Sequence, residues 1–147
     1  MITYIENSNL LDSKADVLIN PVNCEGVMGK GLALEFKRKY PEMFVQYKQF
    51  CTDKILETGW LHWWFDDKNR QYIVNFPTKD KWRKPSKLEY IESGLYRFSK
   101  DCEILGFIQS AAFPRLGCGA GGLLWTDVKP LMERYLEPLK IISEIYV

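Results

Sequence analysis

The sequence has 147 residues, of which 46% are hydrophobic, and this size predicts one globular domain, residues 1–147, with a core of its own. The formal net charge of +1 at pH 7 excludes a uniformly basic surface, so any contact with nucleic acid must come from a local patch. No apolar run approaches the ~20 residues that a membrane span needs, and the N-terminus does not resemble a signal peptide, so we expect a cytoplasmic protein with no membrane partner.

Apolar runs with strand and helix spacing alternate along the chain. The expected strands are residues 2–5, 17–22, 61–65, 71–76, 107–113 and 140–146. The expected helices are residues 31–40 and 42–52, one that runs from a cap at Ser86 to about Leu105, and one that begins near Thr126. This alternation predicts an α/β fold, a three-layer α/β/α domain in which helices cover both faces of a mixed central sheet.

A first glycine loop lies between the second strand and the first helix. Gly26, Gly29 and Gly31 stand directly before apolar residues with helical spacing. Unpaired amide groups and the positive end of a helix dipole meet at such a junction, and glycines let the backbone approach an anion closely. The spacing matches neither a dinucleotide fingerprint nor a P-loop, so on its own it also fits three ordinary turn glycines.

A second glycine-rich segment, residues 116–124, follows the strand at 107–113 and precedes the last helix. Two such loops at the carboxyl ends of strands are expected to face each other across one crevice, which is the usual ligand position in an open α/β sheet. Together they predict a site for a phosphate-bearing ligand.

Residues 76–85 follow another strand and place four basic side chains around Trp82, namely Lys79, Lys81, Arg83 and Lys84. Cations beside an exposed aromatic ring suit a single strand or a flipped base, because phosphates need positive charge and a base needs a stacking plane. We predict that Trp82 stacks on DNA and that Arg83 contacts a phosphate or a base, the alternative being a solvated charged loop. Desolvation and the neighbouring cations should lower the pKa of Lys79 and favour a nucleophilic amine, although a plain surface lysine is the commoner case.

The two helices of the second half carry start signals. Ser86 and Glu89 have the spacing of a capping box, and Thr126 is the expected N-cap of the last helix, with Asp127 in its first turn. The expected inner face of the long helix consists of Leu88, Ile91, Leu95 and Phe98.

The four cysteines contain no metal-binding pair, and the single histidine, His62, does not complete a zinc set, so neither a metal nor a cofactor is expected. Cys24 and Cys118 lie in the two glycine loops, where a thiol nucleophile has to be considered. Such a thiol needs an activating base, and His62 lies in an aromatic strand that favours a packed or surface histidine. Both cysteines are interpreted as reduced, small residues that pack the loops.

Three motifs carry a resemblance to a known family: residues 22–31 with the first glycine loop, Asn-Phe-Pro-Thr-Lys at 75–79, and Gly-Cys-Gly-Ala-Gly-Gly-Leu at 117–123. Their order and types resemble macrodomains, the ADP-ribose-binding fold, and are most similar to DarG-type macrodomains, which remove ADP-ribose from thymidine bases in DNA. DarG-type antitoxins carry a further region after the macrodomain, and this chain is expected to end where the macrodomain ends.

The resemblance implies an enzyme, a DNA ADP-ribosyl glycohydrolase that hydrolyses an N-glycosidic bond and reverses the action of a DNA-modifying toxin. It implies three partners: ADP-ribose, ADP-ribosylated single-stranded DNA and a cognate DNA ADP-ribosyltransferase toxin. Lys79 matches the catalytic lysine, which would act on the distal ribose near Asn23. The further residues implied to contact ADP-ribose are Gly29, Lys30, Gly31, Leu32, Pro114, Leu116, Gly117, Cys118, Gly119, Ala120, Gly121, Gly122 and Leu123.

Asn9 and Leu10 stand where macrodomains carry an Asp and an aliphatic residue, the pair that reads adenine. An Asn carbonyl can still accept a hydrogen bond from the adenine amino group, but without a charge it should bind more weakly. The alternative is that Asn9 is simply a turn residue.

Two other functions remain open. In a sister family, the terminal ADP-ribose glycohydrolases that act on protein acidic residues, an aspartate occupies the position of Gly121. Its absence here favours the DNA branch and argues against acid-catalysed departure of the base, since no other carboxylate is an obvious replacement, although Glu25 is near in sequence. The alternatives are another macrodomain hydrolase, either an ADP-ribose 1″-phosphate phosphatase or a protein de-ADP-ribosylase, and a non-catalytic ADP-ribose reader.

Overall fold

Strand β2 (Val17–Val22) lies in the middle of the protein because its side chains alternate between two cores. Val17 and Ile19 belong to one core, and Leu18 and Val22 belong to the other, and all four are almost fully buried. The computed structural model describes residues 1–147. A strand that is apolar on both faces needs cover on both faces, and the helices supply it.

The central sheet has six strands in the order β1-β6-β5-β2-β4-β3. All neighbouring strands are parallel except β3 and β4, which form an antiparallel hairpin at one edge. Besides β2, the strands are β1 (Ile2–Ile5), β3 (His62–Asp66), β4 (Gln71–Pro77), β5 (Ser110–Phe113) and β6 (Ile142–Tyr146).

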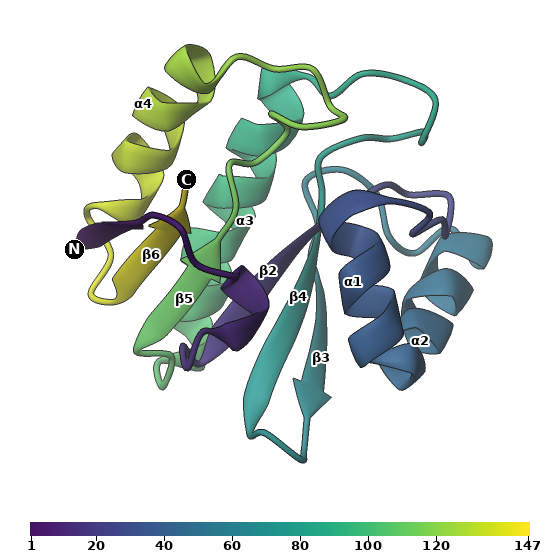
Figure 1. Ribbon diagram of the computed structural model, residues 1–147, viewed down its shortest axis with the longest axis horizontal. Helices are drawn as coiled ribbons and strands as arrows, with labels where there is room; N and C mark the ends of the chain where they lie inside the picture. Colours follow the sequence, from purple (N-terminus) through teal and green to yellow (C-terminus); the bar gives the residue numbers. More distant parts are fainter.

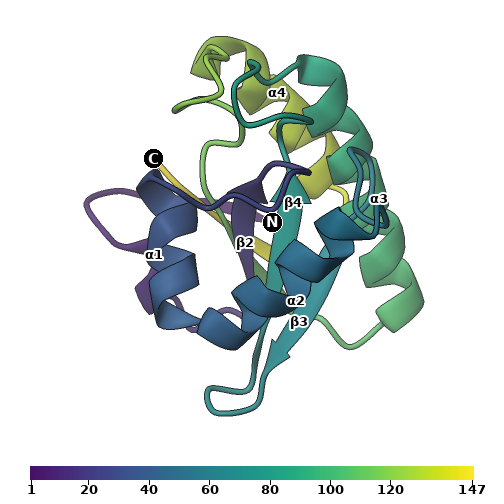
Figure 2. The ribbon, with the colours of Figure 1, turned by 90° about the vertical axis from the view of Figure 1, so that its right-hand side faces the viewer.

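Two pairs of helices enclose this sheet (Figures 1 and 2). On one face lie α1 (Gly31–Lys39) and α2 (Pro41–Thr52), and on the other lie α3 (Leu88–Leu105) and α4 (Trp125–Leu136). A short 3-10 turn, η1 (Leu10–Asp12), connects β1 to β2. The predicted three-layer α/β/α fold and its mixed sheet are therefore confirmed.

The predicted capping box at Ser86 is wrong. Helix α3 begins at Leu88 and has Lys87 as its N-cap, because the carbonyl of Lys87 accepts the amides of Tyr90 and Ile91 at 3.0 and 3.4 Å. The amide of Ser86 instead donates to the carbonyl of Gly121 at 3.0 Å. No side chain caps α3.

The other differences are small shifts at element ends. Leu88 is 40% exposed, whereas Ile91, Leu95 and Phe98 are fully buried as predicted. Helix α4 begins after Leu124 and not after Thr126, because the Leu124 carbonyl accepts the first helical amides.

Strand β5 begins at Ser110, three residues later than predicted. The amide of Gln109 donates to a carboxylate oxygen of Asp16 at 2.8 Å, so it is not available to pair with a strand in the ladder. The side chain of Phe107 is 54% exposed. Separately, none of the helices combines the length and the apolar character that crossing a membrane requires.

Candidate functional site

Three loops leave the same edge of the sheet because β5, β2 and β4 are adjacent and parallel. We call them the second glycine loop (residues 114–124, after β5), the first glycine loop (residues 23–30, after β2) and the Lys79 loop (residues 78–87, after β4). Figure 1 shows the Lys79 loop running out from β4 and returning to the start of α3 beside the loop that precedes α4. The carboxyl edge of a parallel sheet is where α/β proteins place their ligands.

The Lys79 loop is joined by backbone hydrogen bonds to both glycine loops. Near its start, the carbonyl of Asp80 accepts the amide of Cys24 at 3.0 Å. At its end, the amide of Ser86 donates to the carbonyl of Gly121, also at 3.0 Å. The three loops therefore form one connected structure.

The side chain of Glu25 extends from the first glycine loop to the turn that holds Lys79. One of its carboxylate oxygens accepts the amide of Trp82 at 2.8 Å. The Lys79 amine donates to the carbonyl of the same residue, Trp82, at 3.3 Å. The amine therefore rests on a backbone carbonyl, and Glu25 holds the turn that supplies that carbonyl.

The predicted lowering of the Lys79 pKa is present, but its electrostatic source differs from the expectation. Burial is the largest cause of the lowered pKa of the Lys79 amine, and repulsion by Lys30 is the second. Lys30 belongs to the first glycine loop, whereas the sequence had suggested the cations of the Lys79 loop itself. The repulsion thus comes from across the site.

The first glycine loop is organised around the buried side chain of Asn23. Its amide nitrogen donates to the carbonyl of Val27 at 2.8 Å, and its carbonyl oxygen accepts the amide of Glu25 at 2.9 Å. From α2, the Tyr47 hydroxyl lies 2.7 Å from the main-chain carbonyl of Asn23 and 3.1 Å from its side-chain oxygen. Asn23 therefore fixes the loop that would hold a ligand.

Helix α1 begins where this loop ends, and no side chain caps it. Its first residue, Gly31, has φ +60, a backbone conformation that favours glycine. Gly29 and Lys30 are exposed and Leu32 is partly buried at this junction. The first amides of α1 are consequently oriented as donors toward the carboxyl edge of the sheet.

The second glycine loop is a tight turn closed on itself and on Ser86. The Leu123 amide donates to the carbonyl of Gly117 at 3.0 Å. A side chain at Gly121 would overlap with the Ser86 hydroxyl and with the Gly117 carbonyl, so the residue at that position must be glycine. An aspartate like that of the sister family would not fit against Ser86.

The remaining residues of this loop divide by exposure. Gly119, Ala120 and Gly122 are exposed, and Pro114, Cys118 and Leu123 are partly buried. Leu116 is fully buried in the core between the sheet, α3 and α4, so only its backbone remains to face a ligand. No side chain caps α4, which follows the loop directly.

Asn9 is the N-cap of the turn η1. Its side-chain oxygen accepts the amide of Leu11 at 3.0 Å, and the residue is exposed. Leu10 is buried in the core beneath α1 and α2. The turn role of Asn9 is thus present, and contact with adenine stays a prediction.

The thiols of the two glycine loops are poor nucleophiles. Burial raises the pKa of the Cys24 thiol to about 12 and raises the pKa of Cys118 as well. All four cysteines are free. His62, the one histidine, is buried beneath the site, and burial lowers its pKa to about 4. These findings support the interpretation of both cysteines as packing residues.

A buried polar chain beneath the first glycine loop was missed by the sequence analysis. The side chain of Asn20 donates to Asn75 at 2.9 Å, and Asn75 donates in turn to the Nδ1 atom of His62 at 2.9 Å. The Nε2 atom of His62 lies 2.9 Å from the side-chain oxygen of Gln46. The signal that pointed to it is an asparagine within each of two apolar strands.

Trp82 and Arg83 form the outer end of the Lys79 loop. The Trp82 side chain is 43% exposed, and the Arg83 guanidinium lies 4.6 Å from the centre of its ring. The pair therefore presents an aromatic plane and a cation together, as the sequence suggested. Contact of Trp82 and Arg83 with DNA stays a prediction.

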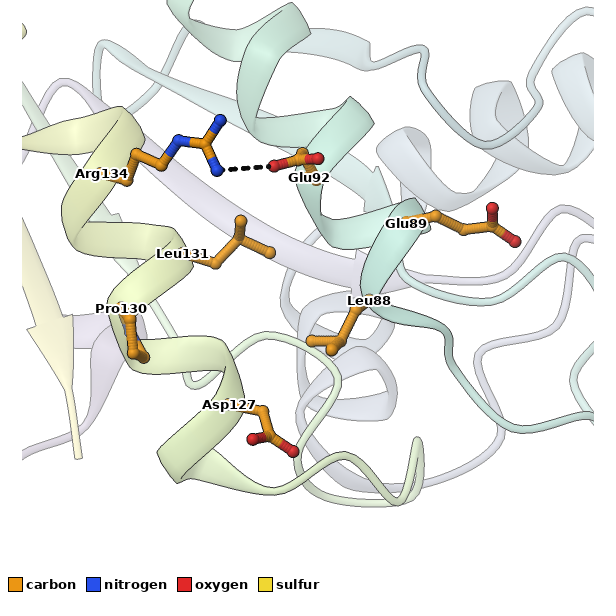
Figure 3. Close-up of a pocket in the computed structure, with 7 residues that line it drawn as sticks. All are labelled: Leu88, Glu89, Glu92, Asp127, Pro130, Leu131 and Arg134. Atoms are coloured by element: carbon orange, nitrogen blue, oxygen red, sulfur yellow. Dashed lines mark ion pairs between the residues drawn. The ribbon is translucent and has the colours of Figure 1, made fainter.

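A groove of about 430 Å³ lies elsewhere, between α3 and α4 (Figure 3). Leu88 and Leu131 form part of its floor, and an ion pair of 3.4 Å joins Arg134 to Glu92 across it. None of the predicted ligand-binding residues lines this groove.

The chain is similar to proteins of known family. The Macro domain family model matches residues 19–132. A DNA ADP-ribosyl glycohydrolase from Mycobacterium tuberculosis is 45% identical over an alignment of 153 residues, gaps included. The alignment covers 99% of this chain and 41% of that protein. The macrodomain of Mycobacterium tuberculosis DarG superposes with a TM-score of 0.95 at 42% identity, covering 99% of this chain and 97% of that one.

A third relative was solved with a ligand. Thermosipho africanus DarTG in complex with ADP-ribose superposes with a TM-score of 0.91 at 36% identity, covering 99% of this chain and 41% of that one. The chain spans about two-fifths of the length of the curated DNA ADP-ribosyl glycohydrolases that it matches.

Proposed function

This chain belongs to the Macro domain family, and we propose that it binds ADP-ribose and hydrolyses the N-glycosidic bond that joins ADP-ribose to thymidine bases in DNA. The observation that carries the proposal is the position of Lys79. Its amine lies on a loop hydrogen-bonded to both glycine loops, and its pKa is lowered by burial and by Lys30. A reader of ADP-ribose would need the glycine loops but not this lysine.

The proposed binding mode follows from the donors at the sheet edge. The diphosphate would lie between the start of α1 and the second glycine loop, where backbone amides converge and no side chain caps the helix. Gly29, Gly31 and Gly119 leave room for close approach, since a Cβ atom at Gly31 or Gly119 would meet nothing within 4 Å. Asn23 would shape the pocket for the distal ribose.

The chemistry assigned to Lys79 follows from the charge that develops during cleavage. Breaking the bond to the thymine nitrogen builds positive charge on the distal ribose, so the anomeric carbon must meet a nucleophile or base while the diphosphate is held still. A neutral amine can attack that carbon or assist opening of the sugar ring. The lowered pKa of Lys79 increases the neutral fraction available at a given pH.

The DNA branch is favoured by the packing at Gly121. A carboxylate at this position is excluded by the close approach of Ser86, so the acid found in the sister family has no counterpart here. Glu25 is engaged with the amide of Trp82. The thymine ring nitrogen can leave as an anion because the carbonyl groups beside it delocalise the charge.

The deciding experiment is incubation of the protein with single-stranded DNA carrying ADP-ribose on thymidine. We expect free ADP-ribose and restored thymidine, detected by mass spectrometry. Parallel samples of ADP-ribose 1″-phosphate and of a protein that carries ADP-ribose on glutamate should be left unchanged. Binding of ADP-ribose without release from any substrate would reduce the function to that of a reader, and no binding at millimolar ADP-ribose would remove the proposal entirely.

A cognate DNA ADP-ribosyltransferase is the toxin partner that this activity implies. The support is that the substrate proposed here is the product of such a transferase. Co-expression of the chain with a thymidine-modifying transferase should restore bacterial growth, and the Lys79→Ala variant should not.

A further inference from the structure

We propose that the outer surface of α3 extends the site into a track for several nucleotides of single-stranded DNA beyond the modified thymidine. The track consists of three pairs of an aromatic ring and a cation: Trp82 with Arg83, Tyr90 with Lys87, and Trp60 with Arg97. This inference rests on the proposed function, because it describes how the same site would hold the strand around its substrate.

The first two pairs are continuous along the chain. Arg83 lies 4.6 Å from the centre of the Trp82 ring at the end of the Lys79 loop. That loop leads directly into α3, whose N-cap Lys87 lies 5.6 Å from the centre of the Tyr90 ring. The track therefore starts at the Lys79 loop and continues onto the first turn of α3.

The third pair continues the same side of α3. Tyr90 and Arg97 are separated by about two helical turns, so they point in nearly the same direction. The segment before β3 lies against the helix between them, with Gly59 packed on Ser93, so the strand would cross this segment between the second and third pairs. Beyond it, the Arg97 guanidinium lies 4.2 Å from the centre of the Trp60 ring.

The length of the track is suitable for a short strand. At about 1.5 Å per residue, the helix from Lys87 to Arg97 is roughly 15 Å long. A stacked nucleic-acid strand advances about 3.4 Å per nucleotide, so this stretch corresponds to about four nucleotides. The Lys79 loop adds the position next to the modified base.

The rings retain free surface for a base. Trp82 is 43% exposed and Trp60 is 49% exposed, although each already has a cation against it. A ring has two faces, so the cation can occupy one face while a base stacks on the other. Stacking of this kind is tolerant of sequence, which suits an enzyme that must follow thymidine in different contexts.

Two of the three cations of the track, Arg83 and Arg97, lack an anionic partner. Only Lys87 has a carboxylate nearby, with Glu89 at 3.9 Å, and neither Arg83 nor Arg97 forms an ion pair. The third pair is supported by the 49% exposed Trp60 ring and by the absence of an ion pair at Arg97.

The test compares two lengths of thymidine-ADP-ribosylated DNA, a trinucleotide and a twelve-nucleotide strand. The wild-type protein should bind the long strand more tightly, and this advantage should shrink as salt is added. Trp60→Ala and Arg97→Gln should each remove most of this advantage. The stack lost in Trp60→Ala should lower the affinity for the long strand by roughly 5- to 150-fold. Hydrolysis of the trinucleotide should stay at the wild-type rate in both variants.

The matched control is Tyr96→Ala on the same helix. Tyr96 is 50% exposed and has the Lys100 amine 5.5 Å from its ring centre, but it lies on the side of α3 that faces Tyr135 of α4. This variant should keep the full length advantage. Thermal unfolding of each variant shows whether it remains folded, and Arg97→Gln, which keeps most of the side chain, supplies the result if Trp60→Ala is unstable.

Two outcomes would overturn the track, and they differ from failure of the proposed function. Equal affinity of the wild type for both lengths, or an equal loss in the Tyr96→Ala protein, would show that this side of α3 does not hold DNA. Failure to hydrolyse either length would instead contradict the proposed function itself.

Discussion

The amide of Ser86 and the carbonyl of Gly121 form a 3.0 Å hydrogen bond that joins the end of the Lys79 loop to the second glycine loop. The same two residues also lie close together on their side-chain side, because a Cβ atom added at Gly121 would overlap with the Ser86 hydroxyl. The catalytic candidate and the candidate diphosphate loop are thus held together by a glycine that cannot be enlarged.

Gly121→Ala should therefore destabilise the protein and weaken ADP-ribose binding. Overpacking of this kind costs about 1–3 kcal/mol, and the Ser86 contact should be the first to break. The control is Gly119→Ala, where an added Cβ meets nothing within 4 Å. Chemical denaturation should show a lower unfolding free energy for the first variant and no change for the second. Equal stability of both would mean that the loop adapts freely.

Lys79→Ala should abolish release of ADP-ribose from thymidine and leave the affinity for ADP-ribose nearly unchanged. That pattern is expected when only transition-state stabilisation is lost. Lys81→Ala, a change of an exposed lysine in the same loop, is the matched control and should retain activity. Calorimetry measures the affinity, and mass spectrometry follows the release. If Lys79→Ala is as active as the wild type, Glu25 becomes the next candidate, followed by Cys24 and Cys118.

The pH dependence of catalysis should report the pKa of Lys79. If the neutral amine acts, kcat/KM rises with pH and levels off above the pKa of the amine in the free enzyme, which lies below the usual 10.5. Lys30→Gln removes the repelling charge, so the pKa of Lys79 should rise and the profile should move to higher pH. Lys81→Gln should leave the midpoint in place. A midpoint that does not respond to Lys30→Gln would argue against this coupling.

Tyr47→Phe should weaken ADP-ribose binding through the first glycine loop. The Tyr47 hydroxyl lies 2.7 Å from the main-chain carbonyl of Asn23, and its loss leaves a buried acceptor unpaired at a cost of about 1–3 kcal/mol. Tyr40→Phe provides the comparison, because the Tyr40 hydroxyl is buried without any partner and its removal should be neutral or stabilising. Measurements of the unfolding free energy and of the ADP-ribose affinity should both show a loss for Tyr47→Phe and none for Tyr40→Phe.

Acid should destabilise the protein through His62. Burial lowers the pKa of His62 from 6.5 to about 4, so the unfolded chain binds a proton in a range where the folded protein does not. This group has no effect on stability above pH 6.5, and between pH 6.5 and 4 it should cost about 3 kcal/mol. Denaturant titrations across this range should show the loss, and His62→Gln should show a shallower dependence. Identical slopes would exclude His62 as the source.

The parts of the fold that the sequence predicted are those determined by apolar periodicity. The alternation of strand and helix segments along the chain implied a sheet covered on both faces, and the structure has it, with Val17 and Ile19 in one core and Leu18 in the other. The errors lie where a long-range contact competes with a local signal. Ser86 has the spacing of a capping residue, but its amide is taken by Gly121, which lies far along the chain.

The same limit applies to the site. Chain order indicated that Lys79 and the two glycine loops share one edge of the sheet, because the ends of adjacent parallel strands meet there. It did not indicate that Lys30 is the cation that repels Lys79, since that pair depends on how two loops fold over the edge. Nor did it reveal the chain of Asn20, Asn75 and His62, because an asparagine in an apolar strand indicates a buried polar group but not the partner that it contacts in the folded protein.

The absence of side-chain caps on α1 and α4 has a consequence for mutational mapping of this protein. The donors expected to hold the diphosphate are main-chain amides, and these remain whichever side chain is removed. An alanine scan of the glycine loops would therefore underestimate their contribution to ADP-ribose binding. At Ala120 the scan would make no change at all. Replacing individual amides with esters, which removes one backbone donor at a time, is the substitution chemistry that would locate the diphosphate.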